Sequence, residues 1–206
     1  AAFRTSYDLN DAPLALILPG SRRSEVSRLL PIFSEVVPDL HTRHPDLQFV
    51  LPAAPNVASA VGEAVQTWAV KPIILNPAQD GMVMKQAAFA AADVAVAASG
   101  TVSLELAASG TPMGIAYDMN WLARQIIGRM LRVDTVTLVN LVSETRVIPE
   151  FIGANCQPEQ IAKAVSTILE APAQQQAAMA LTMDRLGKGG LPPGERAALA
   201  VLDGLK

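Results

Sequence analysis

Short apolar runs alternate along this chain with longer segments in which apolar residues recur every three or four positions. Residues 14–18 read LALIL and residues 94–98 read VAVAA. Unbroken apolar runs of this length are typical of strands buried on both faces, whereas the longer periodic segments are typical of amphipathic helices. The alternation of the two predicts an α/β fold in which a mostly parallel sheet is covered by helices on both faces and joined by right-handed crossovers.

The pattern places strands and helices in alternation up to Pro158 and helices alone after it. We expect strands at residues 14–18, 47–51, 72–75, 94–97 and 113–117, with a last short strand at 136–141. We expect helices at residues 22–43 (bent at Pro31 and Pro38), 57–68, 81–91, 101–109, 120–131, 159–170, 173–186 and 194–205. Residues 187–194, which are rich in Gly and Pro, predict a flexible break before the last helix.

Two of the predicted strands end in small-residue loops that open a helix. The first loop contains Ser21 and Arg22, and a planar guanidinium suits phosphate because it donates two parallel hydrogen bonds. A structural alternative is that Ser21 only caps the helix while Arg22 and Arg23 pair with Glu25.

The second loop is Ser99-Gly100-Thr101, and Glu105 follows one helical turn later. A glycine turn lets a phosphate approach the backbone, and the first N–H groups of a helix have no partners inside it. Thr101 and Glu105 share a helix face, so a diphosphate at the helix start would put its ribose near the Glu105 carboxylate. The alternative is a capped helix with a surface glutamate.

Composition and missing motifs narrow the function classes. The net charge of −3 argues against a nucleic-acid partner. His41, His44 and the single Cys156 form no metal-ligand pattern, and no apolar run reaches the ~18 residues of a membrane span. Neither Gly-x-Gly-x-x-Gly, a Gly-Lys-Ser/Thr loop nor Gly-x-Ser-x-Gly is present, which argues against dinucleotide, P-loop and serine-hydrolase sites.

The predicted helix at residues 120–131 is amphipathic and basic. Trp121, Arg124 and Arg129 lie on its polar side, opposite an apolar stripe. Such a helix can lie on an anionic membrane, which makes these three residues candidate membrane or acyl-chain contacts. The alternative, which we favour, is that the apolar side covers the sheet and the arginines are solvated.

Four motifs follow one another along the chain: residues 18–26 (LPGSRRSEV), 98–105 (ASGTVSLE), 120–122 (NWL) and 133–141 (VDTVTLVNL). In these motifs and their order the sequence resembles the second domain of the lipid-A-disaccharide synthase family, and the similarity covers nearly the whole chain. The resemblance implies the GT-B glycosyltransferase architecture, with this chain as the carboxyl-terminal, Rossmann-like three-layer αβα half. The implied reaction joins the donor UDP-2,3-diacylglucosamine to 2,3-diacylglucosamine 1-phosphate (lipid X), giving a β-1,6-linked disaccharide and UDP.

The resemblance also implies a role for each matching residue. Ser21 and Arg22 look like donor phosphate contacts, Ser99, Gly100 and Thr101 like diphosphate contacts, and Glu105 like the carboxylate that holds the ribose hydroxyls. Asn140 looks like a further donor contact, with capping of a strand end as its alternative role. No metal and no cofactor are implied, because helix dipoles and basic groups would stabilise the departing UDP.

Full members of this family are about twice as long, and the chain does not begin with Met, which is consistent with its being a piece of a longer protein. We expect residues 1–170 to form the donor-binding domain and residues 171–206 to be helices that pack back toward a further, amino-terminal domain. That domain would hold the acceptor site and the catalytic base, so we assign no catalytic residue here. The resemblance implies a cytoplasmic protein at the inner face of the bacterial inner membrane, and the exposed half-cleft favours self-association.

Two other functions remain open from the sequence. One is another GT-B enzyme that uses UDP-N-acetylglucosamine, such as an epimerase or the peptidoglycan transferase, although residues 133–141 argue against it. The other is a free-standing nucleotide-binding module without a catalytic partner. A preference for the unacylated sugar would favour the first, and nucleotide affinity indifferent to an added amino-terminal half would favour the second.

Overall fold

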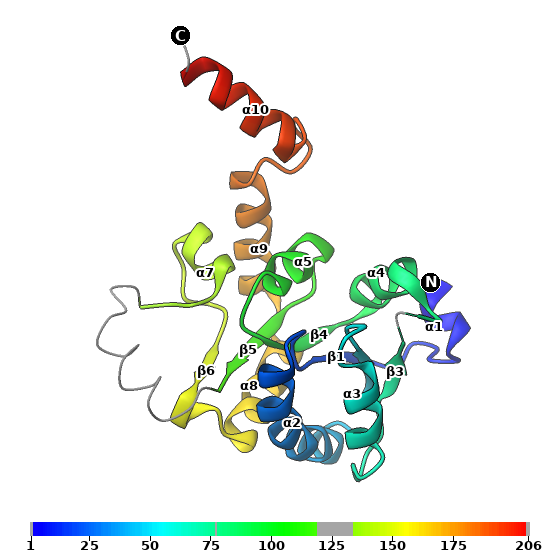
Figure 1. Cartoon of the computed structure of the whole chain (residues 1–206). Coiled ribbons are helices and arrows are strands. Elements are labelled where there is room, and N and C mark those ends of the chain that lie inside the picture. Colours follow the sequence, from blue (N-terminus) through cyan, green and yellow to red (C-terminus); the bar gives the residue numbers. More distant parts are fainter. Residues whose placement is uncertain (1, 77, 119–133, 205–206) are drawn as a thin grey trace.

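The computed structural model describes residues 2–76, 78–118 and 134–204 (Figure 1). At its centre is a six-stranded sheet in the order β3-β2-β1-β4-β5-β6, and every neighbouring pair is parallel. The strands are β1 (Leu14–Leu18), β2 (Gln48–Pro52), β3 (Ile73–Leu75), β4 (Val94–Ala98), β5 (Met113–Tyr117) and β6 (Glu150–Ile152). The prediction of an α/β fold with a largely parallel sheet is confirmed.

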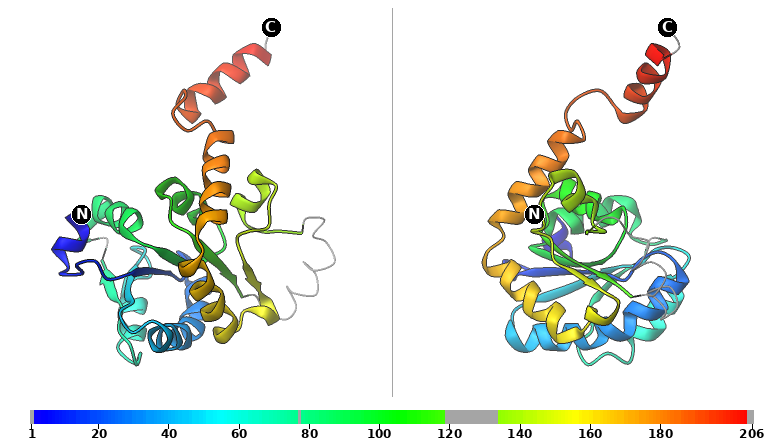
Figure 2. Two further views of the ribbon diagram at one scale, coloured as in Figure 1. Left: turned by 180° about the vertical axis from the view of Figure 1, so that it is seen from behind. Right: turned by 90° about the vertical axis from the view of Figure 1, so that its left-hand side faces the viewer.

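Helices cover both faces of the sheet and make a three-layer sandwich (Figure 2). One face packs against α2 (Arg23–Arg43), α3 (Ala58–Val65) and α8 (Pro158–Glu170). The other packs against α1 (Ala2–Ser6), α4 (Gly81–Ala91), α5 (Val102–Ser109), α7 (Leu138–Ser143) and α9 (Ala173–Arg185). A short 3-10 helix, η1 (Gly153–Asn155), follows β6, and the final helix is α10 (Pro193–Gly204).

Strand β1 shows why the buried strands read as unbroken apolar runs. Its side chains alternate between two hydrophobic cores: Ala15 and Ile17 join the core under α2, while Leu14, Leu16 and Leu18 join the core under α4 and α5. All five residues are buried. Because each face of the strand is covered by helices, no position along it tolerates a polar side chain.

The strand order creates a switch point between β1 and β4. From β1 the chain first adds strands outward through β2 and β3, then returns to β1's other side and continues outward through β4, β5 and β6. Leu18 at the end of β1 pairs in register with Ala97 near the end of β4. The loops after these two strands therefore lie beside each other, and the crevice between them is where open α/β sheets bind ligands.

The predicted strand at residues 136–141 is wrong. These residues lead into helix α7, and the sheet position beside β5 is filled by β6, whose Glu150 pairs with Ile115. The apolar pattern in this run also satisfies a short helix, because Val139, Asn140 and Ser143 all become buried on one side of α7. A period of two and one turn of a helix cannot be told apart over so few residues.

The remaining elements agree with the predicted ones to within a few residues, except that α1, β6 and η1 were not expected. Helix α2 runs without interruption through Pro31 and Pro38. The helix predicted at residues 120–131, including Trp121, Arg124 and Arg129, lies outside the described residues.

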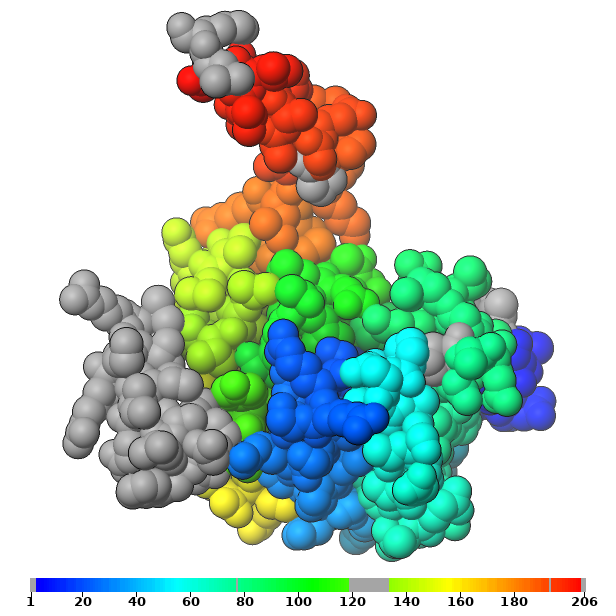
Figure 3. Space-filling model, in the orientation of Figure 1, coloured from blue at the N-terminus to red at the C-terminus, as the bar shows by residue number. Residues whose placement is uncertain are grey.

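The two carboxyl-terminal helices differ in how they meet the rest of the molecule. Helix α9 is part of the core: Met179 and Met183 are buried, and the Gln175 side chain bonds to the Met113 N–H (2.7 Å) and C=O (3.0 Å) of β5. Helix α10 stands clear of the sandwich at the end of the chain (Figure 3). Its Leu199, Val201 and Leu202 are each at least half exposed.

Candidate functional site

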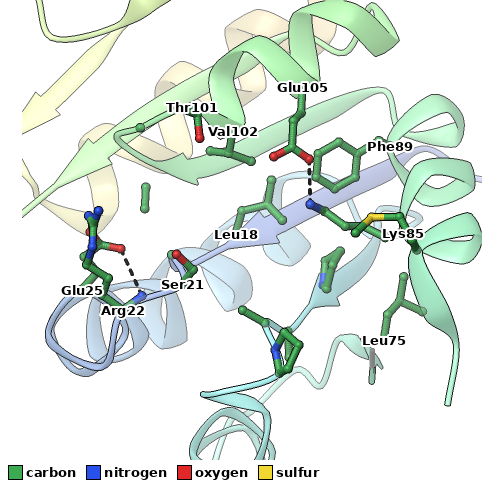
Figure 4. A pocket seen from close by; sticks show the side chains of 18 of the residues that line it. Leu18, Ser21, Arg22, Glu25, Leu75, Lys85, Phe89, Thr101, Val102 and Glu105 are labelled. Carbon is green, nitrogen blue, oxygen red and sulfur yellow. Dashed lines mark hydrogen bonds and ion pairs between the residues drawn. The ribbon is translucent and has the colours of Figure 1, made fainter. Parts of the chain in front are cut away.

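A cleft of about 420 Å³ opens at the carboxyl ends of β1 and β4, the size of a small-molecule site. Six of the seven residues predicted as donor contacts line it: Ser21, Arg22, Ser99, Gly100, Thr101 and Glu105. They come from two loops almost eighty positions apart in the sequence, which the β1–β4 pairing brings together. Ser21, Thr101 and Glu105 can be followed along the cleft in Figure 4.

The first loop depends on Gly20, whose φ of +106° is a conformation that side chains with a Cβ rarely adopt. A Cβ at this position would also lie 2.7 Å from a carboxylate oxygen of Glu25. Glu25 accepts the Arg22 backbone N–H at 3.3 Å and the Arg22 guanidinium at 2.7 Å, so the arginine and the first turn of α2 are tied together. Across the cleft wall, the Asn56 side-chain amide donates to the Ser21 carbonyl at 2.8 Å.

Arg22 thus has the partner that the structural alternative foresaw, but its side chain is 78% exposed, whereas that of Glu25 is 16% exposed. Because the arginine side chain is mostly exposed, it can turn from Glu25 to a ligand phosphate, while Glu25 still accepts the Arg22 backbone N–H.

The second loop leaves a helix start open to the cleft. Gly100 has a φ of +151°, and nothing lies within 4 Å of where its Cβ would be, so a ligand can approach the backbone here. The hydroxyl of the buried Ser103 donates to the Gly100 carbonyl at 2.9 Å and fixes the turn. The N–H groups at the start of α5 point along the helix dipole, which favours a negatively charged ligand group.

Glu105 lies one turn into α5, half exposed, and meets a residue that the sequence did not single out. Its carboxylate accepts a hydrogen bond from the Lys85 ammonium of α4 at 2.7 Å (Figure 4). That ammonium lies 5.1 Å from the centre of the Phe89 ring. Lys85 and Phe89 both line the cleft, yet nothing in the sequence pairs α4 with α5 until the strand order is known.

Asp80 is a second cleft residue that was missed, at the start of α4. Its carboxylate accepts the Asn76 N–H at 2.7 Å and the Tyr7 hydroxyl at 3.2 Å. Burial raises the pKa of Tyr7, and the charge of Asp80 raises it further. With a carboxylate at its own start, α4 is less suited than α5 to receive a phosphate.

Asn140 is not brought to the cleft. It is buried in α7, where its amide nitrogen donates to the Ile148 carbonyl at 2.9 Å and its oxygen accepts the Ile148 N–H at 3.1 Å. These bonds support the capping role rather than the donor contact that the resemblance implied. They hold the main chain just before β6.

Beside Asn140, the carboxylate of Glu150 gathers several donors. It accepts the backbone N–H groups of Val136 (3.2 Å) and Thr137 (2.9 Å) and the hydroxyl of Thr135. Burial alone would raise the pKa of Glu150, but these hydrogen bonds outweigh it and hold the pKa below its ordinary value. This cluster anchors residues 135–137 to β6.

The described residues contain no group of three His, Cys, Asp or Glu side chains arranged to hold a metal ion. Within the same residues, no helix is both long and apolar enough to cross a bilayer.

Taken together, the cleft offers an exposed guanidinium and an open helix start on one side and a carboxylate about one helical turn away on the other. The first pair suits the phosphates of a ligand, and a carboxylate accepts hydrogen bonds from sugar hydroxyls. The geometry therefore fits a nucleoside diphosphate, or a sugar attached to one.

The chain matches a known family and curated relatives along most of its length. The family described as lipid-A-disaccharide synthetase matches residues 4–200. The lipid-A-disaccharide synthase of Ruegeria pomeroyi is 56% identical over 210 residues, covering 100% of this chain and 52% of its own length. Relatives of the same name from Rhodospirillum centenum and Gluconobacter oxydans are matched over 48% and 46% of their own length. The chain therefore spans about half the length of the curated relatives it matches.

Solved structures show the same fold at low sequence identity. The Escherichia coli ADP-heptose LPS heptosyltransferase II is 13% identical with a TM-score of 0.59, covering 84% of this chain and 51% of its own. The carboxyl-terminal domain of a group 1 glycosyl transferase from Francisella tularensis is 14% identical with a TM-score of 0.58, covering 93% of both chains. Both of these neighbours are named as glycosyltransferases, and the fold that they share with this chain is the Rossmann-like half of the GT-B architecture that the resemblance implied. With a match of the family over residues 4–200 and a relative 56% identical across the whole chain, this protein belongs to the lipid-A-disaccharide synthetase family.

Proposed function

We propose that this chain is the donor-binding half of a lipid-A-disaccharide synthase. The whole enzyme would transfer 2,3-diacylglucosamine from UDP to the 6-hydroxyl of 2,3-diacylglucosamine 1-phosphate, with inversion at the transferred carbon. The proposal rests on one observation above the others: Arg22 and the open start of α5 face the same cleft, with Glu105 about one turn further along α5.

In this proposal the diphosphate lies at Ser99, Gly100 and Thr101, where the N–H groups at the start of α5 and the dipole of the helix oppose its charge. Ser21 and Arg22 of the first loop also contact the diphosphate. Glu105 accepts the ribose hydroxyls. As the bond to the sugar breaks, negative charge grows on UDP, and the same groups stabilise it more strongly than they stabilise the bound donor.

The acceptor, its pocket and the base that takes the proton from its hydroxyl belong to the other half of the enzyme. Of residues 171–206, α9 packs on the sheet, so α10 is the part that would face that half, and its exposed apolar side chains support this. Contact with the inner membrane is part of the same proposal, since both substrates are acylated.

Calorimetric titration of the purified chain with UDP tests the donor site. We expect Arg22→Ala and Glu105→Ala each to weaken UDP affinity about tenfold, the effect of losing one hydrogen bond to a charged group at an exposed site. Arg23→Ala is the matched control, because Arg23 has the same charge but does not line the cleft. Unchanged affinity in both cleft variants, with folding intact, would refute the site.

A further inference from the structure

The Lys85–Glu105 pair joins α4 and α5, two neighbouring helices that line one side of the cleft. The ammonium of Lys85 on α4 lies 2.7 Å from Oε2 of Glu105 on α5, and Figure 4 shows the two side chains pointing toward each other. The side chain of Lys85 is 32% exposed and that of Glu105 is 50% exposed. The pair therefore sits on the cleft wall, where a ligand can reach the carboxylate.

Lys85 is itself held in place. Its ammonium lies 5.1 Å from the centre of the Phe89 ring, one turn along the same helix, and Phe89 is 2% exposed. A buried ring fixed in the core restrains the lysine by cation–π attraction. The ammonium is therefore held beside Glu105 instead of sampling many positions in solvent.

One hydrogen bond from Lys85 leaves other acceptor positions of the Glu105 carboxylate available. Two carboxylate oxygens offer about four acceptor positions, and Lys85 occupies one of them on Oε2. The remaining positions can accept hydroxyl groups from a vicinal diol. Because the carboxylate is already oriented, a ligand does not have to restrict the rotation of the glutamate when it binds.

The charge balance of the cleft gives Lys85 a second effect. The charged side chains that line it are the cations Arg22 and Lys85 and the carboxylates Glu25, Asp80 and Glu105. Arg22 is paired with Glu25, so among the described residues that line the cleft Lys85 is the cation that opposes the carboxylates on the α4–α5 side. Without it, a diphosphate would approach two uncompensated negative charges.

We propose that Lys85 is a positioning residue for donor binding, which holds Glu105 in the orientation that accepts ribose hydroxyls and so makes the cleft selective for ribonucleotides over deoxyribonucleotides. This inference rests on the proposed function, because it takes Glu105 as the ribose contact. It assigns Lys85 a role that acts through Glu105 and not through a contact of its own with the phosphates.

Titration of the 206-residue chain with UDP and with 2′-deoxy-UDP tests the inference. We expect the unmodified chain to bind UDP about tenfold more tightly than 2′-deoxy-UDP, the effect of one hydrogen bond to a charged group. Lys85→Met keeps an unbranched side chain and removes the ammonium. Its affinity for UDP should fall more than its affinity for 2′-deoxy-UDP, so that the preference shrinks to about twofold, while Lys85→Arg should keep most of it.

Lys188→Met is the matched control. Lys188 also contacts α5, donating to the Ala108 carbonyl at 3.0 Å, but it lies outside the cleft. It should leave both affinities unchanged. Equal unfolding midpoints of the variants would show that the fold is intact.

Two results would overturn the inference while the proposed function stands. Equal losses for UDP and 2′-deoxy-UDP in Lys85→Met would mean that Lys85 acts on the phosphates directly or through overall charge. An unaltered preference would mean that Glu105 needs no partner. Absence of UDP binding by the unmodified chain would instead refute the proposed function, and this inference with it.

Discussion

At the scale of single residues, Gly20 shows how closely the site depends on backbone conformation. Its positive φ and the Glu25 oxygen 2.7 Å from its missing Cβ leave no room for a side chain. We expect Gly20→Ala to lower the free energy of unfolding by about 1–3 kcal/mol, because both the strained conformation and the contact must be accommodated. Urea denaturation measures the change.

Substitution of Gly62 provides a control, because its expected effect on the free energy of unfolding has the opposite sign. It lies inside α3, and nothing is within 4 Å of where its Cβ would be. Gly62→Ala should raise the free energy of unfolding by about 0.5–1 kcal/mol, because alanine loses less conformational freedom in a helix. Equal effects of the two substitutions would contradict the account of Gly20.

Glu150 makes the stability of the chain depend on pH in the acid range. Its pKa is lower in the folded chain, so its hydrogen bonds contribute fully above the pKa of an unfolded glutamate, about 4.3, and are lost as the pH falls through the lower folded value. We expect Glu150→Gln to be less stable than the unmodified chain at pH 7 and the difference to shrink as the pH falls from about 5 to about 3.

Urea denaturation at several pH values tests this expectation. The exposed Glu170, at the end of α8, gives a matched variant, since Glu170→Gln removes an exposed carboxylate and should leave the free energy of unfolding at pH 7 nearly unaltered. A difference between Glu150→Gln and the unmodified chain that stays constant down to pH 3 would show that the hydrogen bonds of Glu150 do not depend on its charge.

At the scale of elements, a substitution of Asn140 distinguishes two roles for α7, one in the stability of the fold and one in binding of the donor. Asn140→Asp keeps the shape but replaces the donor to the Ile148 carbonyl with an acceptor, and it adds charge within 3.3 Å of Glu150. We expect a loss of about 2–3 kcal/mol in unfolding free energy. UDP affinity, measured under conditions where the variant is folded, should be unchanged.

The exposed Asn155 of η1 gives the matched substitution, because Asn155→Asp should alter neither property. A loss of UDP affinity in Asn140→Asp without a loss of stability would support the donor contact that the family resemblance implied.

Residues 136–150 also show where sequence reasoning reaches its limit. The strands and longer helices could be predicted because each repeats its pattern over a full element. The run around Asn140 is too short for that, and its helical state depends on a contact with Thr182 of α9, 43 positions from Val139, and on a bond to the main chain of Ile148. Local pattern cannot supply such contacts.

The residues that line the cleft also fall into two groups, those that the local sequence could predict and those that it could not. Ser21, Arg22 and Glu105 lie in loops and a helix start that have a local signature, so they could be predicted. Lys85 and Phe89 have none. They enter the site because β1 stands between β2 and β4, which brings the helix after β3 next to the helix after β4. Strand order is a property of the whole sheet.

At the scale of the whole molecule, α9 and α10 mark where the core ends. Gln175 of α9 bonds to β5 and its neighbours Met179 and Met183 are buried, whereas the described side chains of α10 are exposed. Helix α9 is therefore part of the folded unit formed with the sheet. The apolar side chains of α10 are the part of this chain best placed to meet a further domain.

We expect the 206-residue chain to bind UDP yet to form no disaccharide from UDP-2,3-diacylglucosamine and 2,3-diacylglucosamine 1-phosphate, with release of UDP as the measurement. In the proposed function the cleft would stabilise departing UDP, but orientation of the acceptor and a positioned base would come from the other half, and a base alone accounts for ~10²–10⁴-fold in rate.

Fusing the chain to the half of the Ruegeria pomeroyi relative that it does not match should restore turnover, because the 56% identity makes the matched halves close to interchangeable. Arg22→Ala in this fusion should then reduce the rate at least as much as it reduces UDP affinity, since the developing charge on UDP is greater in the transition state than in the bound donor. Disaccharide formed by the unfused chain would contradict the division of labour between the two halves, whereas a fusion that binds UDP and remains inactive would show that the matched halves are not interchangeable.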